Sequence, residues 1–387
     1  MSRQPDAPAG PGPRKQRPKA PYLTVIVPAH RAAGALSESL KALAASDLAP
    51  DAWELVVVND GADDETCAVA RRYADVVLRL PGKPRGPSYA RNRGAEVARG
   101  QVLVFLDADV CPHEDALRRF ADLFSENPDV AAAFGSYDDR PRASGVVSRY
   151  RNLLHHYVHQ CSPGDAETFW AGLGAIRRSV FHEVGMYDEW HFSRPQIEDI
   201  ELGRRIRRHG NRIVLAAEIQ GCHLKRWTFR DVLATDLKHR GVPWTRLILH
   251  EGRNRGARAL NLSPHHRWCS GLAALTALGL VAGLAWWKAW LLIAAALAAA
   301  GVTALNLPFY AVVRRCCGWR TALASIPLHL LFYLANGVSA ITGWIAYSLF
   351  GPPQPPPDVA AFEEIGVETW PPVPARPKES LWYRDGE

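Results

Sequence analysis

The sequence has little of what disulfide-bonded and zinc-binding proteins require. Its 387 residues include seven cysteines, an odd number, and no two of them form a CxxC pair. This usage excludes a disulfide framework and a cysteine zinc site, and it favours a reducing compartment for the soluble part. An internal repeat is absent too, and the composition stays ordinary until about residue 268, where it becomes apolar.

A basic tract interleaved with aromatic residues is also missing, although the net charge is +7. Nucleic-acid binding needs such a patch, so the charge better suits a membrane surface or a phosphate-rich ligand. Residues 1–20 contain Pro, Gly, Ala and basic residues without an apolar run. We therefore predict a disordered basic tail there, and neither a signal peptide nor a helix.

Strand and helix patterns alternate at close spacing through the first part of the chain. The predicted strands are 22–27, 54–58, 75–79, 101–106 and 130–134. Such alternation predicts an α/β domain with a parallel sheet and right-handed crossovers. The carboxyl ends of parallel strands meet at one edge, where open α/β sheets bind their ligands. That edge should collect Pro28–His30, Asn59–Gly61 and Asp107–Asp109.

The run QVLVFLDADV, residues 101–110, carries the strongest chemical signal. A buried strand leads directly into Asp107 and Asp109, whose side chains share one face because strand side chains alternate. Neighbouring carboxylates repel each other, and a hard divalent cation with its preference for oxygen ligands offsets that repulsion. The pair therefore indicates a metal and diphosphate site; the alternative is a solvated turn before the next helix.

Two further segments are candidates for nucleotide binding. Asp60 ends the second strand, where its carboxylate can accept hydrogen bonds from the N–H groups of a nucleotide base. The alternative is that Asp60 is only a turn residue, because Asp-Gly is a turn signal. The segment GPSYARNRG places Arg91 and backbone N–H groups at a helix start, which suits anions, although a capped surface helix has the same pattern.

Later segments carry candidate acid, base and acceptor-binding groups. Glu198 and Asp199 open an amphipathic helix, either as acids favoured by the helix dipole or with Asp199 as a general base. His223 ends a strand and is a plausible third metal contact. The glycines of 168–176 permit close approach of a substrate, or a bend in a strand. The HHxxH of residues 155–159 lacks the glutamate of HExxH, so packed histidines are expected.

The last third of the chain has the character of a membrane protein. Residues 228–250 form a basic amphipathic pattern, typical of an interfacial helix, and three apolar runs follow from residue 269. Arginines 314, 315 and 320 mark a cytoplasmic loop, which predicts a cytoplasmic catalytic domain at the inner (cell) membrane and an outside C-terminal tail. Pro327 and Asn336 leave open a re-entrant hairpin, which would return the tail to the inside.

Six motifs in this order resemble the family 2 glycosyltransferases over residues 22–225: TVIVPAHR, VVVNDGADDET, GPSYARNRG, VLVFLDADV, GAIRRSVFHEVGMYDE and EDIELGRRIRRHG. The resemblance implies a GT-A fold, which is a Rossmann-like nucleotide-sugar-binding α/β domain, with Mg²⁺ or Mn²⁺ and inversion at the anomeric carbon. By position, the implied nucleotide-binding residues are Pro28, His30, Asp60, Arg91 and Asp107. The implied metal ligands are Asp107, Asp109 and His223. The implied catalytic residues are Asp199, as base, and Glu198. The implied acceptor-binding residues are Trp170, Gly172, Gly174 and Arg177.

These patterns divide the chain into five parts. They are the tail 1–20, the GT-A domain 21–227, an interfacial helix and linker 228–267, an all-α transmembrane region of about three spans 268–350, and a Pro-rich acidic tail 351–387. The processive synthases of the family carry QxxRW and more spans, whereas this chain has HLKRW and HRGVPW. We therefore expect addition of one or a few sugars.

The expected partners are a nucleotide-sugar donor (UDP- or GDP-sugar), a lipid-linked or cell-envelope glycan acceptor and the bilayer, without nucleic acid. One alternative is a polyprenyl-phosphate sugar synthase, whose phosphate acceptor has less need of a base. Another is a non-catalytic nucleotide-sugar-binding scaffold, against which the retained acid pair argues.

Overall fold

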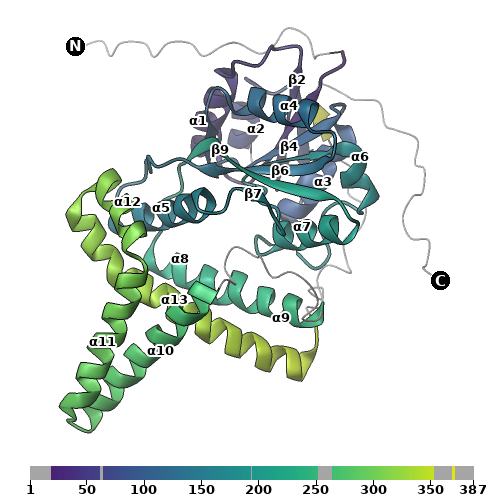
Figure 1. The fold of residues 1–387 in the computed structure, drawn as a ribbon. Coiled ribbons are helices and arrows are strands. Elements are labelled where there is room, and N and C mark those ends of the chain that lie inside the picture. The colour runs from purple at the N-terminus through teal and green to yellow at the C-terminus, as the bar shows by residue number, and fades with distance from the viewer. Residues whose placement is uncertain (1–18, 62–63, 193, 252–263, 353–367, 371–387) are drawn as a thin grey trace, which may run out of the picture.

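A layered α/β domain sits above an all-helical region in the computed structural model (Figure 1). It describes residues 19–61, 64–192, 194–251, 264–352 and 368–370. Most of the predicted tails, and residues 252–263 of the predicted linker, lie outside the described residues.

The centre of the sheet confirms the predicted strands. Four parallel strands stand in the order β3-β2-β1-β4, and their bounds are Leu23–Ala29 (β1), Trp53–Asp60 (β2), Val76–Leu80 (β3) and Val102–Leu106 (β4). Each is a nearly continuous run of buried apolar residues, as expected for strands covered on both faces.

The expectation of a fully parallel sheet is wrong, because one inserted strand runs the other way. β8 (Leu173–Arg177) pairs antiparallel with both β4 and β6 (Val130–Tyr137). Its antiparallel register sets Leu173 beside Leu106 and Arg177 beside Val102. The two ends of β8 therefore lie at opposite edges of the sheet.

The far side of the sheet brings the candidate metal ligands together. β9 (Arg212–His223) is a single long strand, whereas the apolar pattern of the sequence predicts two short strands over 213–215 and 218–223, and it pairs parallel with β6. The short β5 (Val110–Pro112) pairs antiparallel with β9, so that Val110 stands opposite His223. β7 (Gly164–Asp165) also pairs with β9.

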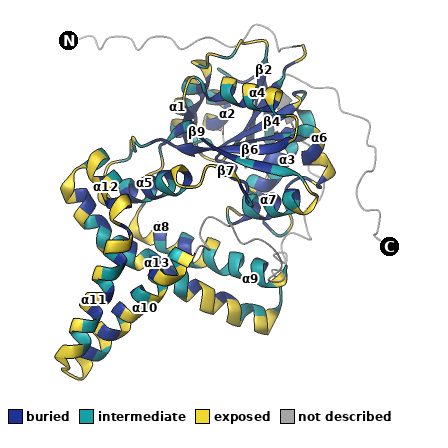
Figure 2. Ribbon diagram, in the orientation of Figure 1, coloured by how far each residue is buried: buried dark blue, intermediate teal, exposed yellow. Residues whose placement is uncertain are grey.

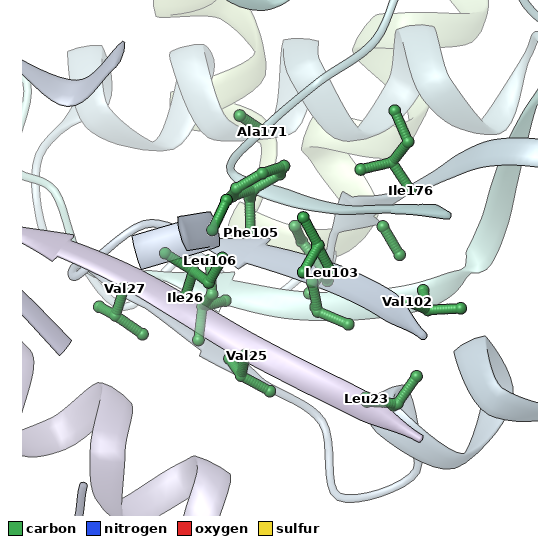
Figure 3. Packing of buried hydrophobic residues seen from close by; sticks show 14 of the residues in the cluster. Leu23, Val25, Ile26, Val27, Val102, Leu103, Phe105, Leu106, Ala171 and Ile176 are labelled. Carbon is green, nitrogen blue, oxygen red and sulfur yellow. The ribbon is translucent and has the colours of Figure 1, made fainter. Parts of the chain in front are cut away.

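Helices cover both faces of the sheet (Figure 1). They are α1 (Ala33–Ala44), α2 (Asp64–Ala70), α3 (Pro87–Val97), α4 (Ala116–Glu126), α5 (Val146–Gln160), α6 (Arg178–Glu183) and α7 (Glu198–Arg208). The core is continuous across β1, β4 and β8 (Figure 3). Phe105 stands at its centre, with the ring centroids of Phe181 and Tyr187 each 5.3 Å away.

The predicted interfacial helix exists and runs without a break through its Gly-Val-Pro segment. It comprises α8 (Phe229–Ala234), the π-helical η1 (Thr235–Gly241) and α9 (Val242–His250), in which Pro243 occupies the first turn. A proline lacks the N–H that the first turn leaves unpaired, so it is accommodated there.

Four helices follow: α10 (Pro264–Ala285), α11 (Ala289–Leu305), α12 (Leu307–Cys317) and α13 (Trp319–Phe350). Among the described residues, two helices, α10 and α13, are long and apolar enough to cross a membrane, or three spans if the pair α11 and α12, bent by 67°, counts as one. α13 is continuous, so the interruption expected in the third run occurs instead in the second. Many residues of these helices are exposed (Figure 2), and large apolar residues such as Leu278, Leu297 and Leu349 are among them.

The predicted position of the C-terminal tail outside the membrane is wrong. β10 (Glu368–Trp370) pairs antiparallel with β3 at the edge of the catalytic sheet. If the apolar helices cross a bilayer, this pairing requires an even number of crossings between the sheet and β10, which two spans would satisfy and three would not.

Small residues allow the interfacial helix to approach α13 closely. A Cβ on Gly241 would lie 2.3 Å from Ser339 Oγ, and one on Gly343 would lie 2.5 Å from Thr245 Cβ. Ser339 Oγ also donates a hydrogen bond to the Asp236 carbonyl at 3.1 Å. Close backbone contact of this kind is typical of helix pairs in membranes.

Gly203 on α7 gives a test of how the acidic helix is positioned. A Cβ there would lie 2.2 Å from the Phe169 backbone nitrogen, so Gly203→Ala should push α7 away from the segment before β8. We expect the melting temperature of the purified chain to fall by several degrees, since overpacking costs about 1–3 kcal/mol. Gly34→Ala on α1 is the control, because nothing lies within 4 Å of its Cβ. Equal melting temperatures for the two variants would contradict this packing.

Candidate active site

One buried arginine joins the two acidic motifs that the sequence separates by about ninety residues. Arg91 on α3 donates from Nη2 to Asp107 Oδ1 at 2.8 Å and from Nη1 to Glu198 Oε1 at 3.3 Å. Its side chain is 4% exposed and that of Glu198 is 8% exposed, so little water screens the second pair. The strand end of β4 and the first turn of α7 are therefore held at one crevice.

The segment between α6 and α7 closes over this arginine. The Arg91 guanidinium lies 5.3 Å from the ring centroid of Tyr187, which is itself buried. Asn92, the next residue of α3, donates to the Tyr187 carbonyl at 2.9 Å and accepts from its N–H at 3.0 Å. Arg91 and Asn92 of the GPSYARNRG motif thus hold the segment around Tyr187 and the acidic residues in place. Arg91 is paired with carboxylates and is not an exposed side chain that could bind an anion by itself.

The pairing of β5 with β9 brings Asp109 and His223 together. His223 Nε2 lies 3.5 Å from Asp109 Oδ2. The His223 Nδ1 donates to Asn152 Oδ1 on α5 at 2.7 Å, and the ring stacks on Tyr137 with centroids 4.3 Å apart. Burial opposes ionisation of Asp109, but the hydrogen bond from His223 and the nearby Lys225 hold the pKa of Asp109 below its usual value. Asp109 is therefore a carboxylate at neutral pH.

These two residues have the chemistry of a partial metal site. A histidine that binds a metal through one ring nitrogen commonly donates a hydrogen bond from the N–H of the other to a fixed acceptor. His223 and Asn152 have this arrangement. Among the described residues, no group of three or more His, Cys, Asp or Glu side chains could hold a metal ion by itself. The donor set fits a hard divalent cation if oxygen atoms of a bound ligand complete the coordination. Asp107 contributes instead to the ion pair with Arg91.

The predicted base-binding aspartate lies at the other end of the crevice and organises a loop. Asp60 accepts hydrogen bonds from the Arg85 N–H at 3.0 Å and the Gly86 N–H at 2.7 Å. Burial raises the pKa of Asp60 against the lowering effect of these two bonds. His30 follows Pro28 and the end of β1, and its Nδ1 donates to the Asp60 carbonyl at 2.6 Å. Pro28, His30 and Asp60 therefore share one strand edge.

Asp199 borders a cavity of about 240 Å³ between the α/β domain and the membrane-proximal helices. Burial and the adjacent Glu198 raise the pKa of Asp199 to about 6, while Arg240 and Arg91 act in the opposite direction. A carboxylate with a pKa near 6 is ionised at neutral pH yet can accept a proton, which is suited to a general base. Its neighbour Glu198 points to Arg91 and is unavailable for that role.

The predicted acceptor residues divide between the two edges of the sheet. Trp170 lines the cavity, and the Gly172 carbonyl accepts a hydrogen bond from the Asp107 N–H at 3.2 Å. A Cβ on Gly172 would lie 2.4 Å from the Trp170 ring, and one on Gly174 would lie 2.3 Å from the Trp170 carbonyl oxygen, so both glycines make room for the chain's own Phe169–Trp170 segment. Arg177 lies at the opposite edge, where it donates to the carbonyls of Phe124, Asn127 and Val130. The structure does not bring Arg177 to the crevice, and its prediction as an acceptor-binding residue is wrong.

The histidines of α5 are packed, as expected. His156 Nδ1 donates to the Tyr137 carbonyl at 2.8 Å, and His159 Nδ1 donates to the Gly135 carbonyl at 3.1 Å. Burial lowers the pKa of His159 to about 4. Burial also lowers the pKa of His155, whose ring lies 4.6 Å from that of Trp170 and borders the cavity. The rings of His155 and His159 are uncharged at neutral pH.

Three residues near the crevice had no role predicted from the sequence. Asn152 and Tyr137 hold His223, and Arg240 of η1 lines the cavity beside Asp199. They come from a helix, a strand end and the interfacial segment. No local spacing relates them to the acidic motifs, so only the packing of elements distant in sequence reveals them.

The double ion pair of Arg91 predicts a large stability effect. Arg91→Met would leave Glu198 buried without a partner, a change that typically costs about 3–5 kcal/mol. We expect the melting temperature in detergent micelles to fall by at least about 6 °C. The double variant Arg91→Met/Glu198→Gln should recover part of this loss. Arg93→Met on the same helix is the control, since its side chain is more exposed than that of Arg91. Equal losses for the two single variants would refute the role of the bridge.

Comparison with known proteins agrees with this arrangement. Residues 24–185 match the family model described as Glycosyl transferase family 2. Glycosyltransferase AglE of Haloferax volcanii is 25% identical over 208 residues, which are 52% of this chain and 67% of that protein. The glucosyl-dolichyl phosphate glucuronosyltransferase of the same organism is 33% identical over 165 residues, 39% of this chain and 50% of that protein. Apart from AglE, the chain thus spans about half or less of the curated relatives that lead the comparison.

The fold is shared with a solved structure, the mannosyltransferase PcManGT from Pyrobaculum calidifontis in complex with GDP-Man and Mn²⁺. The two chains superpose with a TM-score of 0.51 at 19% identity, over 84% of this chain and 90% of the other. At this identity the likeness establishes the fold alone. The predicted GT-A fold is thus confirmed, and residues 24–185 form a domain of the family 2 glycosyltransferases.

Proposed function

We propose that this protein is a membrane-anchored, metal-dependent, inverting glycosyltransferase. It transfers a sugar from a UDP- or GDP-sugar to a hydroxyl of a lipid-linked or cell-envelope glycan. The observation that carries this proposal is the bridge from Asp107 through Arg91 to Glu198, because it holds the donor-side acids and the candidate base at one crevice. The solved structure of PcManGT in complex with GDP-Man and Mn²⁺, which has the same fold, supports the donor class and the metal.

On the donor side, each residue has a distinct task. Asp60 fixes the loop of Arg85 and Gly86 and offers its remaining lone pairs to the base. Asp109 and His223 would hold Mg²⁺ or Mn²⁺ together with the donor diphosphate, and the metal when bound stabilises the charge that develops on the leaving group. Arg91 neutralises Asp107, so that the diphosphate does not meet two free carboxylates.

On the acceptor side, Asp199 acts as the general base. The acceptor hydroxyl enters from the cavity, loses its proton to the Asp199 carboxylate and attacks the anomeric carbon from the face opposite the diphosphate. The C–O bond to the acceptor forms while the bond to the diphosphate breaks, which inverts the anomeric centre. Trp170 forms part of the cavity wall beside this path.

Membrane anchoring follows from the apolar helices, with the catalytic domain on the cytoplasmic side of the inner (cell) membrane. Trp286, Trp287 and Trp290 cluster at the turn between α10 and α11 with large exposed fractions, as expected for residues at a membrane interface. The similarity to the glucosyl-dolichyl phosphate glucuronosyltransferase of Haloferax volcanii, which is named for a lipid-linked sugar, supports a lipid-linked acceptor.

The first test replaces the base. Asp199→Asn should leave nucleotide binding within about twofold and lower turnover about 10²–10⁴-fold. The wild-type rate should fall below a pH of about 6, where Asp199 becomes protonated. Glu218→Gln, an exposed acid on β9, is the control. Turnover is measured as UDP or GDP released from a panel of donors with a membrane extract as acceptor. Near-normal turnover by Asp199→Asn would reject the base and favour a polyprenyl-phosphate sugar synthase, whose acceptor needs little deprotonation.

Asp199→Asn should also change stability in a pH-dependent manner. The pKa of Asp199 is higher in the folded state than in the unfolded state, so the folded protein loses stability as the pH rises through the folded-state value. The loss arises because the ionised carboxylate is buried. The variant should therefore melt at a higher temperature than the wild type at pH 8. The difference should shrink toward pH 5. A constant difference across this range would show that burial of the charge is not its cause.

A second test concerns the metal. Asp109→Ala should abolish metal-dependent binding of the donor, measured by calorimetry with and without Mn²⁺, because the site then loses its carboxylate ligand. Asp122→Ala on the surface of α4 is the control. Metal-enhanced donor binding that survives Asp109→Ala would contradict the assignment. Absence of metal-dependent nucleotide release by the wild type with every donor would favour the non-catalytic scaffold.

A further inference from the structure

The cavity beside Asp199 is bounded on one side by the catalytic domain and on the other by the membrane-proximal helices. Its walls come from α5, α7 and the segment before β8, and from η1, α9 and α13. A ligand in this space therefore touches both the candidate base and the part of the molecule that contacts lipid.

Two charged side chains of the cavity wall, Arg240 and Asp199, have no ion-pair partner among the described residues, and their charges act on each other across the cavity. Arg151 pairs with Asp236 through contacts of 2.6 Å and 3.1 Å, and His155 and His159 are uncharged at neutral pH. Arg240 also lines the cavity, and within the described part of the chain no carboxylate pairs with its guanidinium. An unpaired cation at the wall of a ligand cavity favours an anionic group on the ligand.

Much of the remaining wall is apolar, although Thr168, Thr245, Asn336 and Ser339 also line it. Trp244 and Ile248 of α9 face the cavity from one side, and Phe332 and Ala340 of α13 face it from the other. On α13, Val338 and Ile341, which flank Ala340, are large apolar side chains exposed on the outside of the helix. Apolar side chains of α13 thus continue from the outside of the helix to the cavity wall, which offers a surface for a hydrocarbon chain.

We propose that this cavity binds the phosphate of a lipid-linked acceptor, with Arg240 as the phosphate-binding side chain and the α9–α13 groove holding the adjoining hydrocarbon chain. The inference rests on the proposed function and extends it by naming the acceptor's anionic group and the residue that selects it. Because Arg240 and Asp199 line the same cavity, the phosphate and the reacting hydroxyl lie close together. The acceptor is then a lipid phosphate that carries a short glycan.

The guanidinium also has an electrostatic relation to the base. The charge of Arg240 lowers the pKa of Asp199, against the larger upward effects of burial and of Glu198. A phosphate bound at Arg240 would neutralise that charge, so that Asp199 becomes a stronger base once the acceptor is seated. The geometry thus couples occupation of the acceptor site to proton acceptance.

The test measures binding of radiolabelled farnesyl phosphate to the purified full chain in detergent micelles by scintillation proximity. Arg240→Gln should weaken binding about tenfold or more, because the charged contact to the phosphate is lost. Lys238→Gln is the matched control: it removes a cation from the same element, at a position that is exposed like Arg240 but does not line the cavity. Ala340→Trp, which fills the apolar groove at an exposed site, should weaken binding while Arg240 stays intact.

Three competitors identify the source of the anion. Farnesol, inorganic phosphate and dioleoyl phosphatidic acid should each displace the probe far less well than unlabelled farnesyl phosphate. Equal binding by Arg240→Gln and Lys238→Gln, or equal competition by farnesol, would overturn the phosphate contact. Equal competition by inorganic phosphate would refute the hydrocarbon groove. Equal competition by phosphatidic acid would make the cavity a site for membrane lipid and reject the acceptor.

A separate measurement keeps this inference distinct from the proposed function. Metal-dependent release of UDP or GDP from donors is scored on the same preparations. Farnesyl phosphate binding that depends on Arg240, without nucleotide release from any donor by the wild type, would leave the inference standing and reject the glycosyl transfer. Release of UDP or GDP by the wild type, together with farnesyl phosphate binding that Arg240→Gln does not weaken, would support glycosyl transfer and reject the inference.

Discussion

The arrangement of the active site depends on one buried guanidinium between two carboxylates. Arg91 satisfies Asp107 at the end of β4 and Glu198 at the start of α7, and neither acid has to be buried alone. The cost of removing an ion from water makes the three groups interdependent, since loss of one leaves another uncompensated. The sheet that carries the donor-side acids and the helix that carries Asp199 are therefore fixed relative to each other by electrostatics as well as by the apolar core.

The sequence predicted the strands at the centre of the sheet because each is a continuous apolar run, and it predicted the candidate acids because they follow strand ends or open a helix. It could not predict the direction of β8, since Leu173–Arg177 has the same apolar pattern in either direction. The wrong direction also misplaced Arg177, which follows the strand to the opposite edge. Asn152 and Arg240 were missed because a helix position becomes part of a site only through tertiary packing.

In the helical region, too, sequence patterns predicted individual elements but not how the elements pack together. Hydropathy located the apolar helices, and amphipathic periodicity located the interfacial one. The number of crossings was not local information, because it depends on where β10 pairs. A single short strand at the edge of the catalytic sheet thus changes the expected topology of the membrane region.

The acidic helix is tied to the interfacial helix, and the interfacial helix to α13. Arg204 and Arg208 of α7 both contact Glu251 at the end of α9, while Gly241 and Gly343 bring the interfacial helix against α13 with almost no side chain between them. Asp199 is consequently held at a fixed distance from the apolar helices. Under the proposed function this fixed distance limits the length of the glycan. Every sugar added to a lipid carrier moves the next hydroxyl further from Asp199, so a longer product no longer places its hydroxyl at the base.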